Sequence, residues 1–313
     1  MPHFRKLGRI FHLDTSPKRS TTHTQVPTIF LKEDVVRVYF AARRLDGKSY
    51  PGYVDLARSD LTTIVKLQED PIIELGKPGT FDDEGIMPAC VISRSKNEVW
   101  MYYSGWNQRV TVPYHNSTGI AVSRDGGDTF TQLFAGPVMD RTPNEPYLAV
   151  TPSILFDGNM WRCWYISGLN WTLVGKKYEP VYVIKYASST DGVEWNRPNV
   201  TCIAQHYAAE AFSHPTVVMH GGKFHMWYCY RHSEDFRDGQ GSYRIGYGIS
   251  EDGIHWDRKD ASAGILPSDS GWDSTMQCYP YVIEIDGSFY MFYNGNSFGQ
   301  SGIGLAVLES WST

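Results

Sequence analysis

Long hydrophobic runs are missing from this 313-residue sequence. No window approaches the roughly 20 apolar residues that a membrane-spanning helix needs, so we expect no membrane span. The N-terminal stretch MPHFRKLGRIFHLD contains basic residues, but its apolar runs are too short for a secretory signal peptide. We therefore expect a cytoplasmic protein.

An excess of positive charge is also missing, because the formal net charge is −5. A chain with this balance has no electrostatic reason to bind nucleic acid or an anionic membrane surface. Cysteine is sparse: the five residues show no short Cys-x-x-Cys spacing, which indicates reduced, buried thiols rather than disulfides or a zinc site. The histidines show no spacing that is specific for a metal. We expect neither a metal nor another cofactor.

The sequence does contain a repeat, which occurs five times with a period of 61 to 65 residues. Each copy opens with a proline in an apolar segment: Pro27, Pro88, Pro152, Pro215 and Pro280. A second segment in each copy carries an aromatic residue at a matching position: Phe40, Tyr103, Tyr165, Tyr228 and Tyr293. Segments such as VRVYFAA and FYMFYNG are short, β-branched and aromatic, so they predict strands and exclude a helical solenoid. The Ser-x-Asp-Gly pattern after the third segment is interpreted as a structural turn.

The two ends of the chain complement each other. Residues 4–13 are strand-like and come before the first copy, whereas the last copy stops near Trp311, after its third strand. We therefore predict an all-β fold, a five-bladed β-propeller of four-stranded antiparallel blades, in which the N-terminal strand completes the last blade and closes the ring. Closure would remove the exposed edges of an open array. No linker separates the copies, so we expect a single domain over residues 1–313.

The prolines place the strands within the blades. Because proline cannot donate to a strand ladder but is tolerated at the first residue of a strand, each should begin an innermost strand. The residues before it should then converge on the mouth of a central funnel. Four blades bring an acid there, five to seven residues before the proline: Asp82, Glu145, Glu210 and Asp273. Gathered carboxylates repel, so at least one should have a raised pKa and act as a general acid. The alternative is that these acids cap turns or pair with arginines.

Further polar and aromatic residues lie in the same connections. Aromatic rings stack on sugars, and arginines fork onto hydroxyls or anions, so these side chains are candidates for binding a carbohydrate. The alternative for most of them is a solvated loop. The candidates are His23, Gln25, Arg43, Asp83, Glu84, Trp106, Asn107, Tyr114, His214, Arg231, Asp235, Arg237, Gln277 and Asn294.

Several stretches together resemble a known superfamily: LGRIFHLD, THTQVP, GTFDDEGIMPA, TPNEPYLAV, DFRDGQGSYRIGYG and GWDSTMQCYP. They look like the five-bladed propeller glycosidases, which include arabinanases, β-xylosidases, invertases, levansucrases and mannoside phosphorylases. The resemblance covers essentially the whole chain and is closer to uncharacterised members associated with surface-polysaccharide genes. It implies a carbohydrate substrate and catalytic acids from different blades, here Asp82, Glu145, Glu210 and Asp273 by position.

One departure from the superfamily pattern concerns the first blade. His23 and Gln25 stand where invertase-like and arabinanase-like enzymes carry a leading Asp, and Asp14 is the nearest substitute. Three hypotheses follow. The first is cleavage or transfer of a glycosidic bond by paired carboxylates. The second is a phosphorylase or glycosyltransferase-like enzyme, with a cation clamp built from Arg43, Arg231, Arg237 and His23. The third is a glycan-binding propeller without catalysis, which the missing Asp favours.

Overall fold

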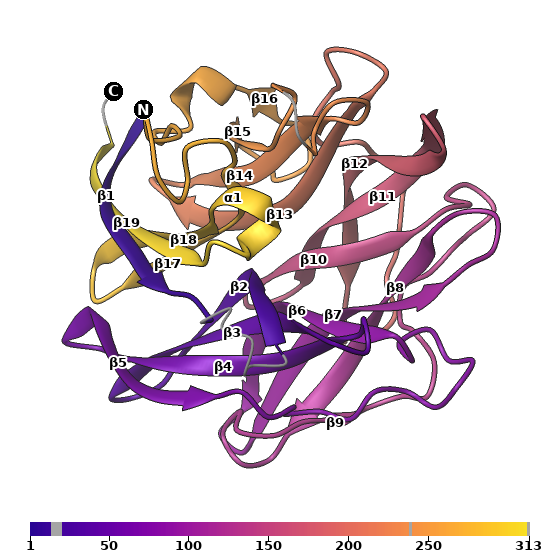
Figure 1. Cartoon of the computed structure of the whole chain (residues 1–313). Coiled ribbons are helices and arrows are strands. Elements are labelled where there is room, and N and C mark those ends of the chain that lie inside the picture. The colour runs from indigo at the N-terminus through magenta and orange to yellow at the C-terminus, as the bar shows by residue number, and fades with distance from the viewer. Residues whose placement is uncertain (14–20, 238–239, 312–313) are drawn as a thin grey trace.

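The computed structural model describes residues 1–13, 21–237 and 240–311, so Asp14 lies outside the described residues. The chain is built from short strands, which confirms the all-β class (Figure 1). The strands are β1 (Pro2–Phe11), β2 (Thr21–Leu31), β3 (Val35–Arg44), β4 (Ser49–Ala57), β5 (Asp60–Gln68), β6 (Gly85–Ser95), β7 (Glu98–Gln108), β8 (Tyr114–Ser123), β9 (Thr131–Gln132), β10 (Ala149–Phe156), β11 (Trp161–Val174), β12 (Lys177–Ser189), β13 (Glu210–His220), β14 (Lys223–His232), β15 (Arg244–Ser250), β16 (Asp257–Arg258), β17 (Cys278–Ile285), β18 (Ser288–Asn294) and β19 (Ile303–Trp311). The helical elements are η1 (Asp260–Ser262) and α1 (Asn296–Gly299). Within the described residues, no helix has the length and apolarity to cross a membrane.

The strands form antiparallel units that follow the repeat. One sheet has the order β13-β14-β15-β16 and another β1-β19-β18-β17. The remaining strands follow one hydrogen-bonded path, but β4 meets β6, and β8 meets β10, through a single parallel residue pair each. This path therefore divides into the antiparallel units β2–β5, β6–β9 and β10–β12. The first strands of all the units contact one another in a cycle: β2 with β6, β6 with β10, β10 with β13, β13 with β17, and β17 with β2.

The N-terminal strand lies at the other end of the chain. β1 pairs antiparallel with β19, from Pro2 opposite Trp311 to Phe11 opposite Ile303, and the two strands lie side by side (Figure 1). Lys6 of β1 also reaches the carboxylate of Asp273, with 2.6 Å between Nζ and Oδ2. The N-terminal segment therefore supplies the fourth strand of the last sheet, as the sequence predicted.

The five repeat prolines do not begin their strands, and this part of the prediction was wrong. Pro27, Pro88, Pro152, Pro215 and Pro280 all lie inside the first strand of their unit, at a shift in register with the second strand. A β-bulge leaves one residue without a ladder bond, so it tolerates a residue that has no N–H to donate. The residue before the proline has a positive φ in four units: Val26, Thr151, His214 and Tyr279. Such a backbone is rare for residues other than glycine and costs energy.

The Ser-x-Asp-Gly segments form turns that hold neighbouring units together. Asp125 accepts backbone hydrogen bonds from Asp128 and Thr129, each 3.0 Å long, which confirms the structural interpretation of this pattern. The glycine carbonyl of such a turn accepts a hydrogen bond from an aromatic side chain of the preceding unit. These bonds run from Tyr39 to Gly127, from Tyr102 to Gly192 and from Trp164 to Gly253.

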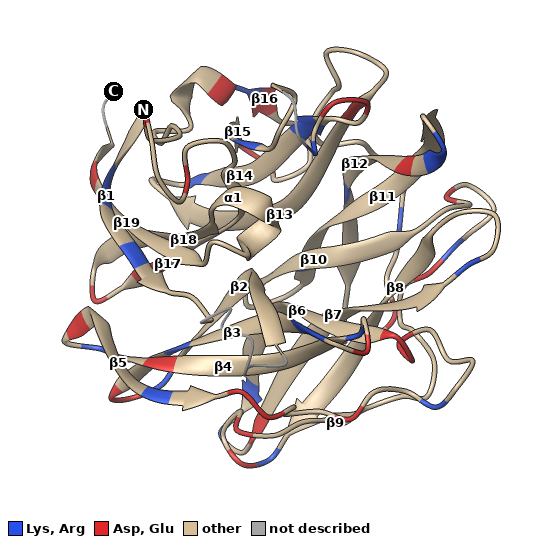
Figure 2. Ribbon diagram, viewed as in Figure 1, with Lys and Arg blue, Asp and Glu red and all other residues tan. Residues whose placement is uncertain are grey.

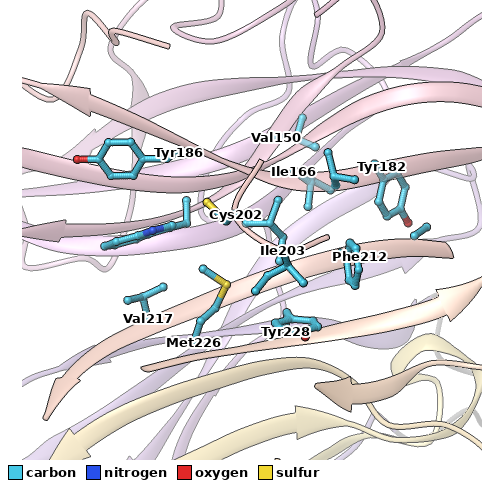
Figure 3. Packing of buried hydrophobic residues seen from close by; sticks show 14 of the residues in the cluster. Val150, Ile166, Tyr182, Tyr186, Cys202, Ile203, Phe212, Val217, Met226 and Tyr228 are labelled. Carbon is cyan, nitrogen blue, oxygen red and sulfur yellow. The ribbon is translucent and has the colours of Figure 1, made fainter. Parts of the chain in front are cut away.

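The core lies between the faces of successive units. Figure 3 shows the cluster between β10–β12 and β13–β15, where Ile166, Phe212 and Met226 pack together. All five cysteines are unpaired and buried, which confirms that prediction. Charged residues of both signs lie mostly on the connections around the outside (Figure 2). The apolar faces therefore fix the units against one another and leave the ends of the first strands to form a site.

Candidate functional site

A hollow lies where the strands β2, β6, β10, β13 and β17 meet. Its two adjoining parts, of about 320 and about 110 Å³, share Gln25, Met87, Tyr114, Asn116 and Tyr279. The residue directly before each repeat proline lines it: Val26, Met87, Thr151, His214 and Tyr279. We call this hollow the central pocket. The bulge at each proline therefore turns one residue of every unit toward a common space.

Polar and aromatic side chains complete the wall of the central pocket. Arg43 donates a hydrogen bond from Nε to Oε1 of Gln25, at 3.0 Å, and Trp106 lies in the same wall. Asn116 Oδ1 and His214 Nδ1 are buried and have no hydrogen-bond partner within the described residues. Buried polar atoms are nearly always satisfied, so each exception needs an explanation such as a water or a ligand. An apolar wall with a few convergent polar groups is typical of a small-molecule site.

The histidines of this region carry no charge at neutral pH. Burial lowers the pKa of His214 to about 3. Burial, together with the charge of Arg43, lowers the pKa of His23 to about 4. Neither imidazole can therefore supply a positive charge. His214 lines the central pocket, whereas the predicted binding residue His23 does not line it, and its Nδ1 lies 2.9 Å from the hydroxyl of Thr22.

The structure brings together five of the predicted binding residues, namely Gln25, Arg43, Trp106, Tyr114 and His214. Sequence reasoning missed other residues of the wall: Val26, Ser49, Met87, Asn116, Thr151, Tyr182, Ser213 and Tyr279. A signal for five wall positions was present, because one residue stands directly before each repeat proline. It was overlooked because the prolines were expected to begin the strands rather than to lie in bulges.

Arg231 lies behind the wall and not in it. Its side chain is 2% exposed and donates to the hydroxyl of Tyr243 at 3.1 Å and to the carbonyl of Pro180 at 2.9 Å. The guanidinium stacks over Phe236 at 3.7 Å, and its Nη1 has no partner within the described residues. Tyr243 shares a hydrogen bond with Tyr182, which lines the pocket. Arg231 therefore borders the pocket through a tyrosine pair.

Two more predicted residues of this region, Arg237 and Asp235, lie outside the central pocket wall. Arg237 forms a two-pronged pair with Glu179, with distances of 2.7 and 3.0 Å. Asp235 is exposed on the connection after β14. Like Arg231, these two residues therefore do not line the central pocket.

Three predicted amides hold the backbone instead of facing the central pocket. Asn294 is fully buried; its Oδ1 accepts from the N–H of Val26, and its Nδ2 donates to the carbonyl of Thr24. Asn107 donates to the carbonyl of Thr80 at 3.1 Å. Gln277 donates to the carbonyl of Leu266 at 3.1 Å and to the carboxylate of Asp273 at 3.0 Å. Asn294 thus fixes the bulge of β2 and supports the pocket from behind.

Asp82 and Asp273 occupy matching places in their units. Tyr103 donates to Asp82 at 2.8 Å, and Tyr293 donates to Asp273 at 3.0 Å. Both tyrosines are the aromatic residues of the second strand of the repeat. Lys6 adds an ion pair to Asp273. Each carboxylate is therefore held within its own unit.

Glu145 and Glu210 are held by buried cations. Arg197 lies 2.9 Å and Lys185 3.6 Å from the carboxylate of Glu145, and Arg258 grips Glu210 through two bonds of 2.6 and 2.8 Å. Burial by itself would raise the pKa of Glu145, but the hydrogen bond and charge of Arg197 lower it below its usual value. The pKa of Asp273 is lowered in the same way, against its burial, mainly by Lys6. A raised pKa was expected in this set, and for these two acids the shift has the opposite sign.

The structure therefore does not place the four predicted acids in the wall of the central pocket. None of them is among the residues that line the central pocket, and within the described residues no hydrogen-bond partner is shared between two of them. The physical reason is the tyrosine or cation that each acid meets in its own unit. The four acids are Asp82, Glu145, Glu210 and Asp273.

Asp83 and Glu84 lie just before β6, at the rim of the central pocket. Glu84 is bonded through its backbone to Ser49 and to Trp106, which both line the pocket. Its carboxylate is 3.4 Å from Lys48 and partly exposed. Asp83 accepts from the backbone of Gly79, and its Oδ1 is buried without a partner within the described residues. Glu84 is thus the acid tied most directly to the pocket wall.

Solved structures with the same fold define the class. The chain superposes on a structure titled glycoside hydrolase with a TM-score of 0.74 at 18% identity, covering 98% of this chain and 92% of that one. A thermostable family-43 glycoside hydrolase gives a TM-score of 0.67 at 18% identity, covering 95% and 92%. The Bombyx mori GH32 β-fructofuranosidase gives 0.62 at 15% identity, covering 96% and 61%. The chain has the propeller fold of these glycoside hydrolases, and the resemblance to their superfamily is confirmed for the fold.

Sequence comparison shows the family. The chain is 34% identical over 310 residues to two Mycobacterium tuberculosis proteins, uncharacterized protein MT1551 (strain CDC 1551 / Oshkosh) and uncharacterized protein Rv1502 (strain ATCC 25618 / H37Rv). The match covers 98% of this chain and 99% of each relative, so the chain belongs to their family. It is also 28% identical over 127 residues to the β-1,2-mannobiose phosphorylase of Thermoanaerobacter sp. (strain X514), covering 37% of this chain and 40% of that protein. No protein-family model matches the chain.

Proposed function

We propose that the protein binds a carbohydrate in the central pocket and cleaves or transfers a glycosidic bond there. The observation that carries the proposal is the convergence of Gln25, Arg43, Trp106, Tyr114 and His214 where the first strands meet. Amides, an arginine and aromatic rings are the groups that recognise sugar hydroxyls and sugar faces. The fold shared with glycoside hydrolases supports this reading by analogy.

The chemistry requires a carboxyl group within reach of the bound sugar. We propose Glu84 as the first candidate for the proton donor, because its backbone is bonded to two residues of the pocket wall and its carboxylate is partly exposed. This carboxylate would have to turn from Lys48, 3.4 Å away, toward the pocket. The four acids named from the sequence remain candidates in this proposal. Each would have to leave its tyrosine or cation before it could donate or accept a proton. They are Asp82, Glu145, Glu210 and Asp273.

The test is a glycan screen followed by matched variants. Oligosaccharides are incubated with the protein, products are detected by mass spectrometry, and binding is measured by isothermal titration calorimetry. Arg43→Gln should weaken binding by about tenfold, because a charge-assisted hydrogen bond is lost. Arg44→Gln is the control, since the Arg44 guanidinium stacks over Tyr50 and does not line the central pocket. Glu84→Gln should retain binding and lose turnover. Equal binding by the two arginine variants would refute the central pocket as the sugar site.

A second candidate is phosphorolysis, favoured because Arg43 lines the pocket while no carboxylate does. Of the predicted clamp, Arg231 keeps one nitrogen without a partner, whereas the charge of Arg237 is neutralised by Glu179. His23 is uncharged at neutral pH. Release of a sugar 1-phosphate only when inorganic phosphate is added would establish this reaction. Binding without any product would favour the third hypothesis, a glycan-binding propeller without catalysis.

We also infer that the chain is a closed ring of five blades and a single domain. The blades would be β2–β5, β6–β9, β10–β12, β13–β16 and β17–β19 with β1. The cycle of contacts among the first strands and the pairing of β1 with β19 support this arrangement. A cytoplasmic location is likewise part of the proposal, supported by five unpaired cysteines.

A further inference from the structure

A second hollow of about 540 Å³ adjoins the central pocket on its outer side. It lies between the β7–β8 connection, the segment before β10 and the β11–β12 hairpin. The residues that matter here are Arg109, Tyr114, Arg141, Tyr147 and Trp171. We call it the outer pocket. Tyr114 lines both pockets, so a chain of sugar units could pass from one to the other.

The outer pocket carries two positive charges without a partner. Arg109 and Arg141 are exposed, and within the described residues neither guanidinium forms an ion pair or a side-chain hydrogen bond. The nearest acid in sequence, Asp140, is engaged by Nε2 of His115 at 2.7 Å and by the backbone N–H of Arg141. No Asp or Glu lines the hollow. A cleft lined by charges of one sign raises the local concentration of ligands of the opposite sign.

Aromatic rings form another part of this surface. Trp171 stands at the end of the β11–β12 hairpin, and its ring meets Tyr114 edge-on, with centroids 5.2 Å apart and planes at 73°. Tyr147 lies in the same wall. Aromatic faces give a flat contact for a sugar ring, and arginine forks match the two oxygens of a carboxylate or phosphate. Two free arginines beside two aromatic rings therefore fit a sugar that carries a negative charge.

We propose that the outer pocket binds an acidic sugar unit, a uronic acid or a sugar phosphate, of a glycan whose next unit occupies the central pocket. The proposal rests on the proposed function, because it assigns a substrate class to the same glycan site. Arg109 and Arg141 bind the anion, and Trp171 supports the ring. The protein then selects acidic glycans over neutral ones of the same size.

The test compares matched ligands by isothermal titration calorimetry. Oligomannuronate is compared with manno-oligosaccharides, oligogalacturonate with galacto-oligosaccharides, and a phosphorylated manno-oligosaccharide with its neutral parent. We expect an acidic member to bind about tenfold tighter than its neutral partner, as expected for one charge-assisted contact. The preference should shrink when NaCl rises from about 0.05 to about 0.5 M, because salt screens exposed charges. Comparing the carboxylate with the phosphate decides which anion is preferred.

Variants of the two arginines test whether the outer pocket is responsible for the preference for acidic glycans. Arg109→Gln and Arg141→Gln should each reduce the acidic preference, and the double variant should abolish it. Arg124→Gln, an exposed arginine on the turn after β8, is the control and should keep the preference. Equal affinity for acidic and neutral partners, or a preference that survives in the double variant, overturns this inference and leaves the proposed function intact. Failure of every glycan to bind or react overturns both.

Discussion

At the scale of single residues, Glu145 is a buried carboxylate whose charged neighbours make its replacement destabilising. Arg197 and Lys185 are both nearly buried beside it. Glu145→Gln would leave these two cations without a counter-charge, so we expect the free energy of unfolding to fall by about 3 kcal/mol. Urea denaturation measures the loss, and Glu194→Gln, at an exposed position, is the control. Unchanged stability together with lost turnover would instead place Glu145 in the chemistry.

A second prediction at this scale concerns pH. The pKa of His214 falls from 6.5 in the unfolded chain to about 3 in the folded one because the imidazole is buried. Between these values the unfolded chain binds the extra proton, so stability is complete above about pH 6.5 and is lost as the pH falls. For this one group the slope is about 1.4 kcal/mol per pH unit.

Urea unfolding at several pH values checks this slope. His214→Asn should show a shallower fall than the wild type between pH 6.5 and pH 3. The exposed His12→Asn is the control and should follow the wild type. Identical slopes for His214→Asn and the wild type would contradict the prediction.

Residue types and spacing predicted part of the candidate site. Gln25, Arg43, Trp106, Tyr114 and His214 line the central pocket from within the strands β2, β3, β7, β8 and β13. The acids could not be placed in the same way. Spacing along the chain locates a backbone segment at the funnel, but the direction of a side chain depends on which partner it meets. A tyrosine or a cation in the same unit captures each carboxylate.

At the scale of elements, the second and third strands of a unit share one packing rule. The aromatic residue of the second strand stands opposite a glycine of the third: Phe40 opposite Gly52, Tyr103 opposite Gly119, Tyr228 opposite Gly246 and Tyr293 opposite Gly304. Because glycine has no side chain, there is room for a second aromatic ring in two of the units. Phe81 stacks on Tyr103, and Trp272 on Tyr293. This pairing places the acid that follows each of these rings beside a tyrosine hydroxyl.

This rule predicts the effect of a single methyl group. A Cβ at Gly304 would overlap the ring of Trp272 and come within 2.9 Å of Tyr293. Gly304→Ala should therefore lower the free energy of unfolding by about 2 kcal/mol, as overpacking does in other cores. Gly136→Ala is the control, because a Cβ there meets nothing within 4 Å. Thermal unfolding of both variants measures the difference. Equal midpoints would show that the rings of Trp272 and Tyr293 can shift to make room for the methyl group.

The strands themselves were predictable, but their bulges were not. Alternating aromatic and β-branched residues mark a strand whatever its neighbours are. A proline shows only that one ladder bond is missing, and both a strand start and a bulge satisfy that condition. The choice between them depends on the twist of the whole sheet. For this reason the sequence alone does not place Met87 and Tyr279 in the central pocket, where the structure has them.

At the scale of the whole molecule, the repeat and the unpaired third strand of the last copy were enough to predict where the N-terminus goes. An exposed edge strand presents unpaired backbone groups that tend to pair with another strand. The unpaired edge of the last copy and the N-terminal strand, which belongs to no copy, are therefore expected to pair. The aromatic-to-turn hydrogen bonds between units could not be read from the sequence. Tyr102 and Gly192, for example, lie far apart along the chain and meet only when successive units pack.

Removal of β1 tests the importance of this contact. A chain that lacks residues 1–13 would expose the edge of β19 and leave Asp273 without Lys6. We expect a lower unfolding temperature and self-association through the free edge, measured by calorimetry and size-exclusion chromatography. A synthetic peptide of residues 1–13 added in trans should reverse both effects. A truncated protein that stays monomeric at the original unfolding temperature would contradict this prediction.

The pairing of β1 with β19 has a consequence for biosynthesis. Because β1 precedes β19 in the chain, β1 is synthesised first and stays unpaired until β19 has been made. The central pocket takes part of its wall from β2, β6, β10, β13 and β17, so a nascent fragment that lacks one of these strands cannot present the whole pocket. The complete pocket therefore forms only after β17, which carries Tyr279, has been synthesised.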